Sequence, residues 1–87
     1  MSKKEFESQE EFTIGDRFYS VRHTLKMTQS ELAGKLYVVT IYISMIENNK
    51  KKPGIRLVNR LIDLCEKHGI ELELGFIRPD YARKKKS

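Results

Sequence analysis

The fold of this chain is decided by residues 28–48, which read TQSELAGKLYVVTIYISMIEN. The first four residues have the form of a capping box, in which the side chains of Thr28 and Glu31 each bond the other residue's backbone amide at the start of a helix. Apolar residues then recur at helical spacing as far as Leu36. These signals predict a helix from Thr28 to about Leu36 with one buried side.

A second helix is predicted after a short turn, from about Thr40 to Asn48. Successive side chains of a helix are about 100° apart, so this segment divides into two sides. The inner side carries Tyr42, Ile43, Ile46 and Glu47, and the outer side carries Thr40, Ile41, Ser44, Met45 and Asn48. We therefore expect two short helices joined by a tight turn.

Helical patterns also lie on both sides of this pair. Upstream, a helix is predicted behind the N-cap residue Thr13 from apolar residues at helical spacing, namely Ile14, Phe18, Val21 and Leu25. Downstream, a basic loop at 50–54 leads to a predicted helix over residues 55–67, which Gly69 ends. The sequence thus indicates a mainly α domain.

Residues 70–77 change to a period of two, which is typical of a strand with one buried face. A single strand cannot satisfy its own backbone donors and acceptors. We therefore expect it to pair with the same strand of a second chain. The face that would dimerise carries Ile70, Leu72, Leu74 and Phe76.

The chain is long enough for one small core, since it has 87 residues, of which 39% are hydrophobic and 33% charged. We divide it into a flexible polar leader at 1–12, a helical domain at 13–69, a dimerisation strand at 70–77 and a flexible basic tail at 78–87. No apolar run is long enough to span a membrane, no signal peptide is recognisable, and there is one cysteine. These features favour a soluble cytoplasmic protein.

The formal net charge of +5 comes mainly from residues 13–69, which carry ten basic and five acidic groups, and from the tail. Basic clusters favour polyanionic partners, nucleic acid first and an anionic membrane second. A charged surface that only keeps the protein soluble is the alternative. No nucleophile–base pair, glycine-rich phosphate loop or metal cluster is recognisable, so we expect no enzyme, cofactor, metal site or small-molecule substrate.

The segment from Met27 to Pro53 resembles the phage-repressor-like (Xre-type) helix-turn-helix family. The resemblance extends over about residues 14–69 and lies in Met27-Thr28-Gln29-Ser30-Glu31-Leu32-Ala33, Lys35-Leu36, Val38, Ile43-Ser44, Ile46-Glu47-Asn48 and Pro53. It implies a lambda-repressor-like domain of four to five helices that binds double-stranded DNA. Two residues depart from the family pattern, because Tyr37 stands where a glycine is usual and Val39 where a polar helix cap is usual.

By this resemblance, the outer side of the 40–48 helix enters the major groove and reads bases there. The base-reading residues would be Thr40, Ile41, Ser44 and Met45. Ile41 and Met45 make no bidentate hydrogen bonds but can pack on thymine methyl groups. We therefore expect A·T-containing half-sites, with much of the affinity coming from backbone charge and DNA shape. Alternatively, Ile41 and Met45 belong to the core or to a protein interface.

Other residues match family positions that contact the DNA backbone, namely Thr28, Gln29, Arg22, Lys50, Lys51 and Lys52. Free amides at the helix start beside Gln29 could also hold a phosphate. Arg22 and Glu47 match a pair that forms a salt bridge beneath the DNA-binding surface. The lysines follow the recognition helix, where contacts to phosphate position the protein without specifying sequence.

Helices followed by a final strand also resemble HipB-like antitoxins, which dimerise through such a strand, repress their own operon and bind a toxin. The predicted function is therefore a repressor, autoregulatory in the antitoxin case. It would bind a palindromic operator as a homodimer, with its recognition helices about 34 Å apart. The alternative is a protein-interaction module that neutralises a toxin partner.

Overall fold

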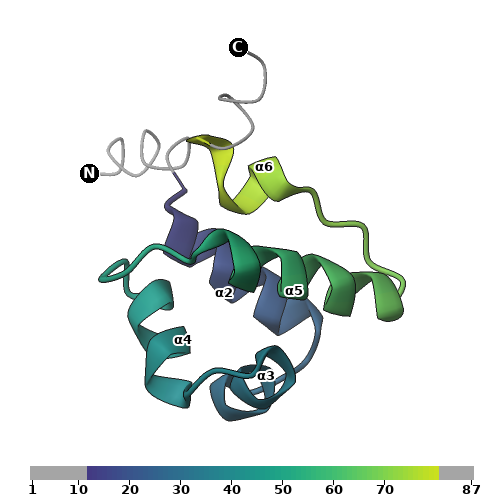
Figure 1. Cartoon of the computed structure of the whole chain (residues 1–87), viewed down its shortest axis with the longest axis horizontal. Coiled ribbons are helices and arrows are strands. Elements are labelled where there is room, and N and C mark those ends of the chain that lie inside the picture. The colour runs from purple at the N-terminus through teal and green to yellow at the C-terminus, as the bar shows by residue number, and fades with distance from the viewer. Residues whose placement is uncertain (1–11, 81–87) are drawn as a thin grey trace, which may run out of the picture.

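The computed structural model describes residues 12–80, within which there are five helices and no strand. The helices are α2 (Ile14–Thr24), α3 (Gln29–Leu36), α4 (Thr40–Glu47), α5 (Ile55–Lys67) and α6 (Leu74–Ile77). In Figure 1, α2 and α5 cross the middle of the molecule, α3 and α4 lie below them and α6 lies above. The prediction of a mainly α fold is confirmed.

Two helices begin at the capping boxes that their sequences indicate. At α2, the Thr13 hydroxyl accepts from the Asp16 amide at 3.0 Å, and the Asp16 carboxylate accepts from the Thr13 amide at 3.2 Å. At α3, Thr28 and Glu31 make the same reciprocal pair at 3.0 and 2.8 Å. Both helix starts are therefore set by local sequence, because each box satisfies two amides that lack a partner inside the helix.

The ends of α2, α3, α4 and α5 share one backbone geometry. Each is followed by a residue in the left-handed region, with φ of 60° at Lys26, 61° at Tyr37, 60° at Asn49 and 73° at Gly69. The next amide in the chain then donates to a carbonyl five residues back, as from Val38 to Ala33 at 3.0 Å. This is the Schellman motif, which satisfies the last carbonyls of a helix.

One core joins all five helices. It is formed by buried apolar side chains, namely Phe18, Val21, Leu25, Leu32, Ala33, Leu36, Ile43, Ile46, Leu57, Val58, Leu61, Cys65 and Ile77. The apolar residues of α3 are all buried, whereas Ile55 and Ile62 of α5 are only half-buried. Leu57 of α5 and Ile77 of α6 are buried in the core as well.

The prediction of a strand at 70–77 is wrong. Residues 70–73 have no regular structure, and α6 follows at Leu74–Ile77. A helical turn needs no second chain, because the amides of Phe76 and Arg78 donate to the carbonyls of Glu73 at 3.0 Å and Leu74 at 2.8 Å. The turn also buries Ile77 completely, on the opposite side of the predicted strand from Phe76.

The ends of the chain lie largely outside the described residues. Of the predicted leader at 1–12 only Phe12 is described, and of the predicted tail at 78–87 only residues 78–80 are. Arg78 belongs to the fold rather than to a flexible tail, since its guanidinium donates to the Pro53 carbonyl at 2.6 Å and pairs with Asp80 at 2.6 Å. No helix in residues 12–80 has the length and apolar character needed to cross a bilayer.

Candidate nucleic-acid interface

The two sides of α4 differ in burial as the sequence indicates. Ile43 and Ile46 are fully buried, whereas Thr40 is exposed and Ile41 has 65% of its surface exposed. Ser44 and Met45 are half-buried. Thr40 and Ile41 therefore lie on the exposed side of α4, and Ile41 does not belong to the core, whereas Ser44 and Met45 share the half-buried class of Tyr42 and Glu47.

The turn before α4 presents a row of exposed apolar side chains. Tyr37 is 80% exposed and Val39 is 66% exposed, next to Ile41. Arg60 of α5 supports this turn, because its guanidinium lies 5.6 Å from the centre of the Tyr37 ring and donates to the Leu36 carbonyl at 3.0 Å. The turn thus accommodates Tyr37 in a left-handed conformation that usually requires glycine.

The sequence analysis missed Arg60 as part of this surface. Its contact with Tyr37 joins residues 23 positions apart, and no sequence pattern indicates such a contact. Val39 does not cap α4, as expected from its apolar side chain, because the helix begins there without a side-chain hydrogen bond to its first turn. A valine has no oxygen with which to cap a helix.

A hydrogen-bonded network lies directly beneath the surface of α3 and α4. The Arg22 guanidinium donates to both carboxylate oxygens of Glu47, at 2.7 and 3.0 Å, and to the Met27 carbonyl at 2.9 Å. The Gln29 amide group donates to the same carboxylate at 3.0 Å. One carboxylate from α4 therefore holds side chains from α2 and α3, which fixes the angle between the three helices.

Arg22 and Gln29, which were expected to contact the DNA backbone, also hold the helices together through this network. The hydrogen bond to Glu47 raises the pKa of Arg22 above its ordinary value, so its guanidinium stays charged. Each guanidinium nitrogen of Arg22 already donates within the protein. Arg22 and Gln29 therefore hold α4 in position, and the salt bridge expected between Arg22 and Glu47 is present. Contact of either side chain with a phosphate stays a prediction.

The start of α3 is also partly occupied by its own cap. The Thr28 hydroxyl accepts from the Glu31 amide, and the Glu31 carboxylate accepts from the Thr28 amide. The amides of Gln29 and Ser30 lie between these two and point out of the first turn, as first-turn amides do in any helix. An anion at this site would meet these two amides and the Thr28 hydroxyl, with the Glu31 carboxylate opposing it.

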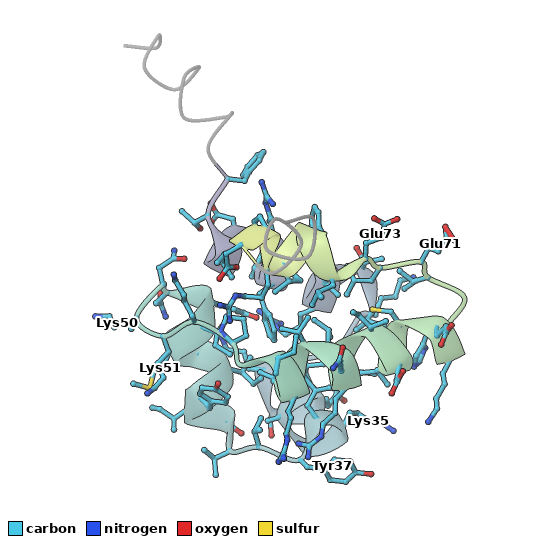
Figure 2. The ribbon with its side chains drawn as sticks, turned by 45° about the horizontal axis from the view of Figure 1, so that its top comes forward. Lys35, Tyr37, Lys50, Lys51, Glu71 and Glu73 are labelled. Carbon is cyan, nitrogen blue, oxygen red and sulfur yellow. The ribbon has the colours of Figure 1, made fainter. Side chains whose placement is uncertain are left out.

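Basic side chains surround the outer side of α4. Residues 35–60 carry six basic groups, namely Lys35, Lys50, Lys51, Lys52, Arg56 and Arg60, and one acidic group, Glu47, which is paired with Arg22. The three lysines after α4 are all exposed, and Figure 2 shows Lys50 and Lys51 projecting outward beside α4. We call the outer side of α4 together with Lys50, Lys51 and Lys52 the basic surface.

The loop that carries these lysines is fixed to the start of α2 by Asn49. Its side-chain oxygen accepts from the Gly15 amide at 2.9 Å, and its side-chain nitrogen donates to the Thr13 hydroxyl at 3.0 Å. Gly15 lies so close to α4 that an added Cβ would be 2.6 Å from the carbonyl oxygens of Ile46 and Glu47. The loop therefore has a defined position relative to α4.

Comparison of the chain with protein families, with curated proteins and with solved structures gave no match. Within residues 12–80, no cluster of three or more His, Cys, Asp or Glu side chains is arranged to hold a metal ion.

Proposed function

We propose that this protein is a transcriptional regulator that binds double-stranded DNA sequence-specifically, with a lambda-repressor-like arrangement in which α4 is the recognition helix. The observation that carries the proposal is the basic surface, where a short helix exposes Thr40 and Ile41 and is followed at once by three exposed lysines. A helix fits the major groove of B-DNA, which is about 12 Å wide. Lysines beside it meet the phosphates.

The supporting network gives the proposal a mechanism. Base edges are read only if the reading side chains keep a fixed height and angle in the groove, while phosphate contacts set the register. Glu47 binds Arg22 and Gln29, and Asn49 binds the start of α2, so α4 and its lysines move together with α2 and α3. A repressor that only needs to occupy its operator requires no further chemistry.

The reading residues favour a particular kind of operator. Ile41 has 65% of its surface exposed, and an aliphatic side chain contacts the thymine methyl group rather than a guanine edge. Thr40 and Ser44 supply hydroxyl groups that accept or donate. We therefore expect half-sites that contain A·T pairs, with a large salt-dependent contribution from the lysines.

Selection of bound duplexes from random sequence at physiological salt tests the proposal. We expect recovery of a common A·T-containing motif. Substitution Lys51→Ala should weaken binding to all duplexes alike, whereas Thr40→Ala and Met45→Ala should change the motif. Lys67→Ala, which removes an exposed lysine at the far end of α5, is the matched control and should change neither. Absence of any saturable duplex binding, or a motif that contains only G·C pairs, would contradict the proposal.

The number of copies on the operator follows from the same selection. With a helical α6 in place of a strand, the strand-paired homodimer loses its physical basis, and Ile70, Leu72 and Leu74 pack against the chain's own core. A palindromic motif with half-sites about one DNA turn apart would show that two copies bind. A single half-site would show that one copy suffices. The resemblance to HipB-like antitoxins relied on a final strand, which α6 replaces, so the regulator is the one function proposed.

A further inference from the structure

An apolar groove runs between α2 and the segment that leads into α6, outside the basic surface. It has a volume of about 440 Å³ and is lined by Ser20, Val21, Thr24, Ile70, Glu71, Leu72, Glu73 and Phe76. Val21 is buried, Ile70 and Leu72 are half-buried, and Phe76 keeps 43% of its surface exposed. We call this site the α2–α6 groove.

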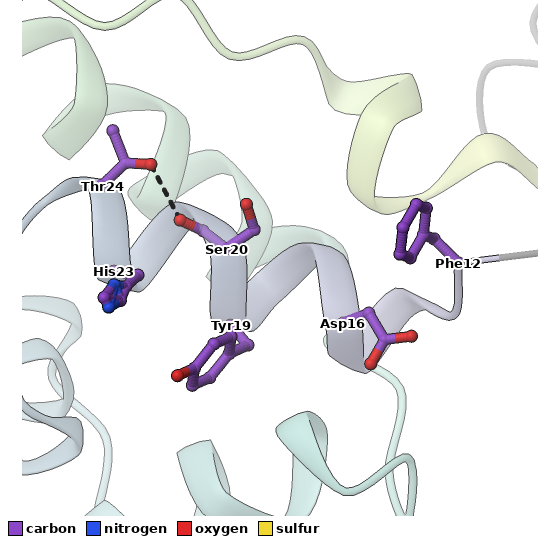
Figure 3. A pocket seen from close by; sticks show the side chains of 6 residues that line it. All are labelled: Phe12, Asp16, Tyr19, Ser20, His23 and Thr24. Atoms are coloured by element: carbon purple, nitrogen blue, oxygen red, sulfur yellow. Dashed lines mark hydrogen bonds between the residues drawn. The ribbon is translucent and has the colours of Figure 1, made fainter. Parts of the chain in front are cut away.

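Two neighbouring hollows extend the groove along α2. One is lined by Phe12, Asp16, Arg17, Ser20 and Phe76, and the other by the outer side of α2 from Asp16 to Thr24 together with Phe12 (Figure 3). Asp16, Ser20 and Thr24 follow one another at intervals of four residues. Side chains at this spacing form a ridge, and small ones at Ser20 and Thr24 let a second helix approach closely.

The Thr24 hydroxyl on this ridge already has a polar partner within the helix. Thr24 donates its hydroxyl to the Ser20 carbonyl at 2.9 Å, which is the dashed line of Figure 3. Exposed aromatic rings stand at both sides of the ridge, with Phe12 58% and Tyr19 49% exposed. Apolar side chains of a partner would thus find aromatic contact here.

The charge around the groove is opposite in sign to that of the whole chain. Glu71 and Glu73 are exposed at its rim and have no ion pair within residues 12–80, while Asp16 lies at its other end. Arg17 is turned to Phe76, since it donates to the Phe76 carbonyl at 2.9 Å and lies 5.2 Å from the ring centre. Figure 2 shows Glu71 and Glu73 on the side of the molecule away from Lys50 and Lys51.

We propose that the α2–α6 groove docks a cationic amphipathic helix of a partner protein. Apolar side chains of that helix contact Val21, Leu72 and Phe76 of the groove. Its Lys or Arg side chains lie beside Glu71 and Glu73. Charge complementarity selects this occupant, because the acidic rim belongs to a chain of net charge +5. A second copy fits less well. Two-fold pairing would bring each copy's acidic rim into the same interface.

The groove and the basic surface share no residue, so the partner and DNA can bind at the same time. Binding at the groove therefore recruits the partner to DNA if the proposed function holds, and stays measurable without DNA if it does not. The inference does not depend on the proposed function.

The test uses the full chain labelled with ¹⁵N and an amphipathic helical peptide of about 15 residues, which makes four turns. One side of the peptide carries leucines and its flanks carry lysines. We expect saturable shifts at the amides of Ser20, Thr24, Leu72 and Phe76. The same peptide with glutamate in place of lysine should bind about tenfold more weakly or not at all.

Two variants separate this site from non-specific attraction. The double substitution Glu71→Gln and Glu73→Gln should weaken binding of the lysine peptide about three- to tenfold. Glu66→Gln, which removes an exposed glutamate of α5 outside the groove, should leave it unchanged. Because all three side chains are exposed, both proteins should keep the parent's amide spectrum and its retention of DNA.

Several results would overturn the proposal. They are the absence of saturable shifts, shifts confined to α4, equal binding of both peptides, or equal effects of the groove variant and the Glu66→Gln control. Concentration-dependent broadening of the groove signals without peptide would assign the groove to a second copy instead, and would also overturn it.

Discussion

Within residues 12–80, four helices are followed by a residue in the left-handed backbone region, and only one of these four residues, Gly69, is a glycine. The other three differ in what their side chains do. Lys26 is exposed and its side chain makes no hydrogen bond within the described residues, Tyr37 lies against Arg60, and Asn49 bonds Gly15 and Thr13. The cost of a left-handed conformation is therefore offset by contacts at Tyr37 and Asn49 but not at Lys26.

This difference predicts opposite effects of the same substitution. A side chain in the left-handed region costs about 1 kcal/mol or more, so Lys26→Gly should stabilise the fold by up to about 1 kcal/mol. Asn49→Gly removes two hydrogen bonds between α2 and the loop after α4, and should destabilise it by about 1–2 kcal/mol. Urea unfolding measures both. Stabilisation by Asn49→Gly would show that its bonds contribute nothing.

Gly15 has a different reason to be glycine, because the space for a Cβ is already occupied by backbone of α4. An alanine there would lie 2.6 Å from two carbonyl oxygens. We expect Gly15→Ala to force α2 and α4 apart and to lower the free energy of unfolding by about 1–3 kcal/mol.

The matched control is Gly34→Ala in α3, where nothing lies within 4 Å of an added Cβ. Alanine is a better helix former than glycine, so this change should leave stability unchanged or raise it by up to about 1 kcal/mol. Equal losses of stability for both variants, measured by thermal unfolding, would contradict the close approach at Gly15.

Cys65 links stability to pH. Its thiol is fully buried, and burial raises its pKa above the ordinary value of 9.0. As the pH rises past that value, the thiol of the unfolded chain loses its proton before the folded one does. Its contribution to stability is therefore complete at neutral pH and is lost as the pH rises towards the folded pKa.

We expect Cys65→Val to remove this part of the pH dependence. Urea unfolding under reducing conditions, at neutral pH and about one unit above the ordinary thiol pKa, measures it. Relative to the variant, the parent should lose stability between the two conditions. Parallel behaviour of the two proteins would show that the folded thiol ionises as readily as the unfolded one.

At the scale of elements, the helices follow from local sequence but the segment 70–77 does not. Capping boxes and helical spacing define α2 and α3, because their causes lie within a few residues. The alternating pattern at 70–77 fits a strand equally well in isolation. A strand needs a partner for every backbone group, whereas α6 satisfies its own and buries Ile77 between α2 and α5.

This distinction has a direct test. In the structure Ile77 is fully buried and Phe76 is 43% exposed, whereas a half-buried strand would bury Phe76 and expose Ile77. Ile77→Ala should therefore cost about 2–5 kcal/mol of stability. Phe76→Ala should cost clearly less, since much of its ring already contacts water. The reverse order of the two losses in chemical unfolding would favour the strand.

At the scale of the whole molecule, charge is divided between two sides. The basic surface carries Lys50, Lys51 and Lys52, and the α2–α6 groove carries Glu71 and Glu73. Such a division orients an approaching polyanion before contact, and the groove lies away from the lysines proposed to meet DNA. The molecule can therefore present a second partner without giving up its first surface.

The lysines make a quantitative prediction for the proposed DNA complex. Each lysine that neutralises a phosphate contributes about 0.9 to the slope of log affinity against log salt concentration. The triple substitution of Lys50, Lys51 and Lys52 by Gln should reduce that slope by up to about 2.7. Stability should change by less than about 0.5 kcal/mol, because all three side chains are exposed. Fluorescence anisotropy over a salt series measures the slope. An unchanged slope would show that the three lysines do not contact phosphates.

Much of the candidate site could be predicted, because a helix turns once every 3.6 residues and the spacing of apolar residues in α4 therefore shows which side is buried. The spacing placed Ile43 and Ile46 inside and Thr40 and Ile41 outside, and the structure agrees. The salt bridge between Arg22 and Glu47 was expected from the family resemblance and is present, whereas the bond of Gln29 to the same carboxylate was not expected. Both depend on where Glu47 points, and its carboxylate contacts residues 25 and 18 positions away in the chain.

The sequence alone determined where α2 and α3 begin, and it indicated the approximate spans of α4 and α5, because capping boxes and helical spacing act over a few residues. Only the tertiary structure decided that residues 74–77 coil into α6, that Arg60 supports Tyr37, and that acidic side chains border a groove beside α2. The physical reason is that these features depend on contacts between segments distant in the chain. Their energies arise only once the core has formed.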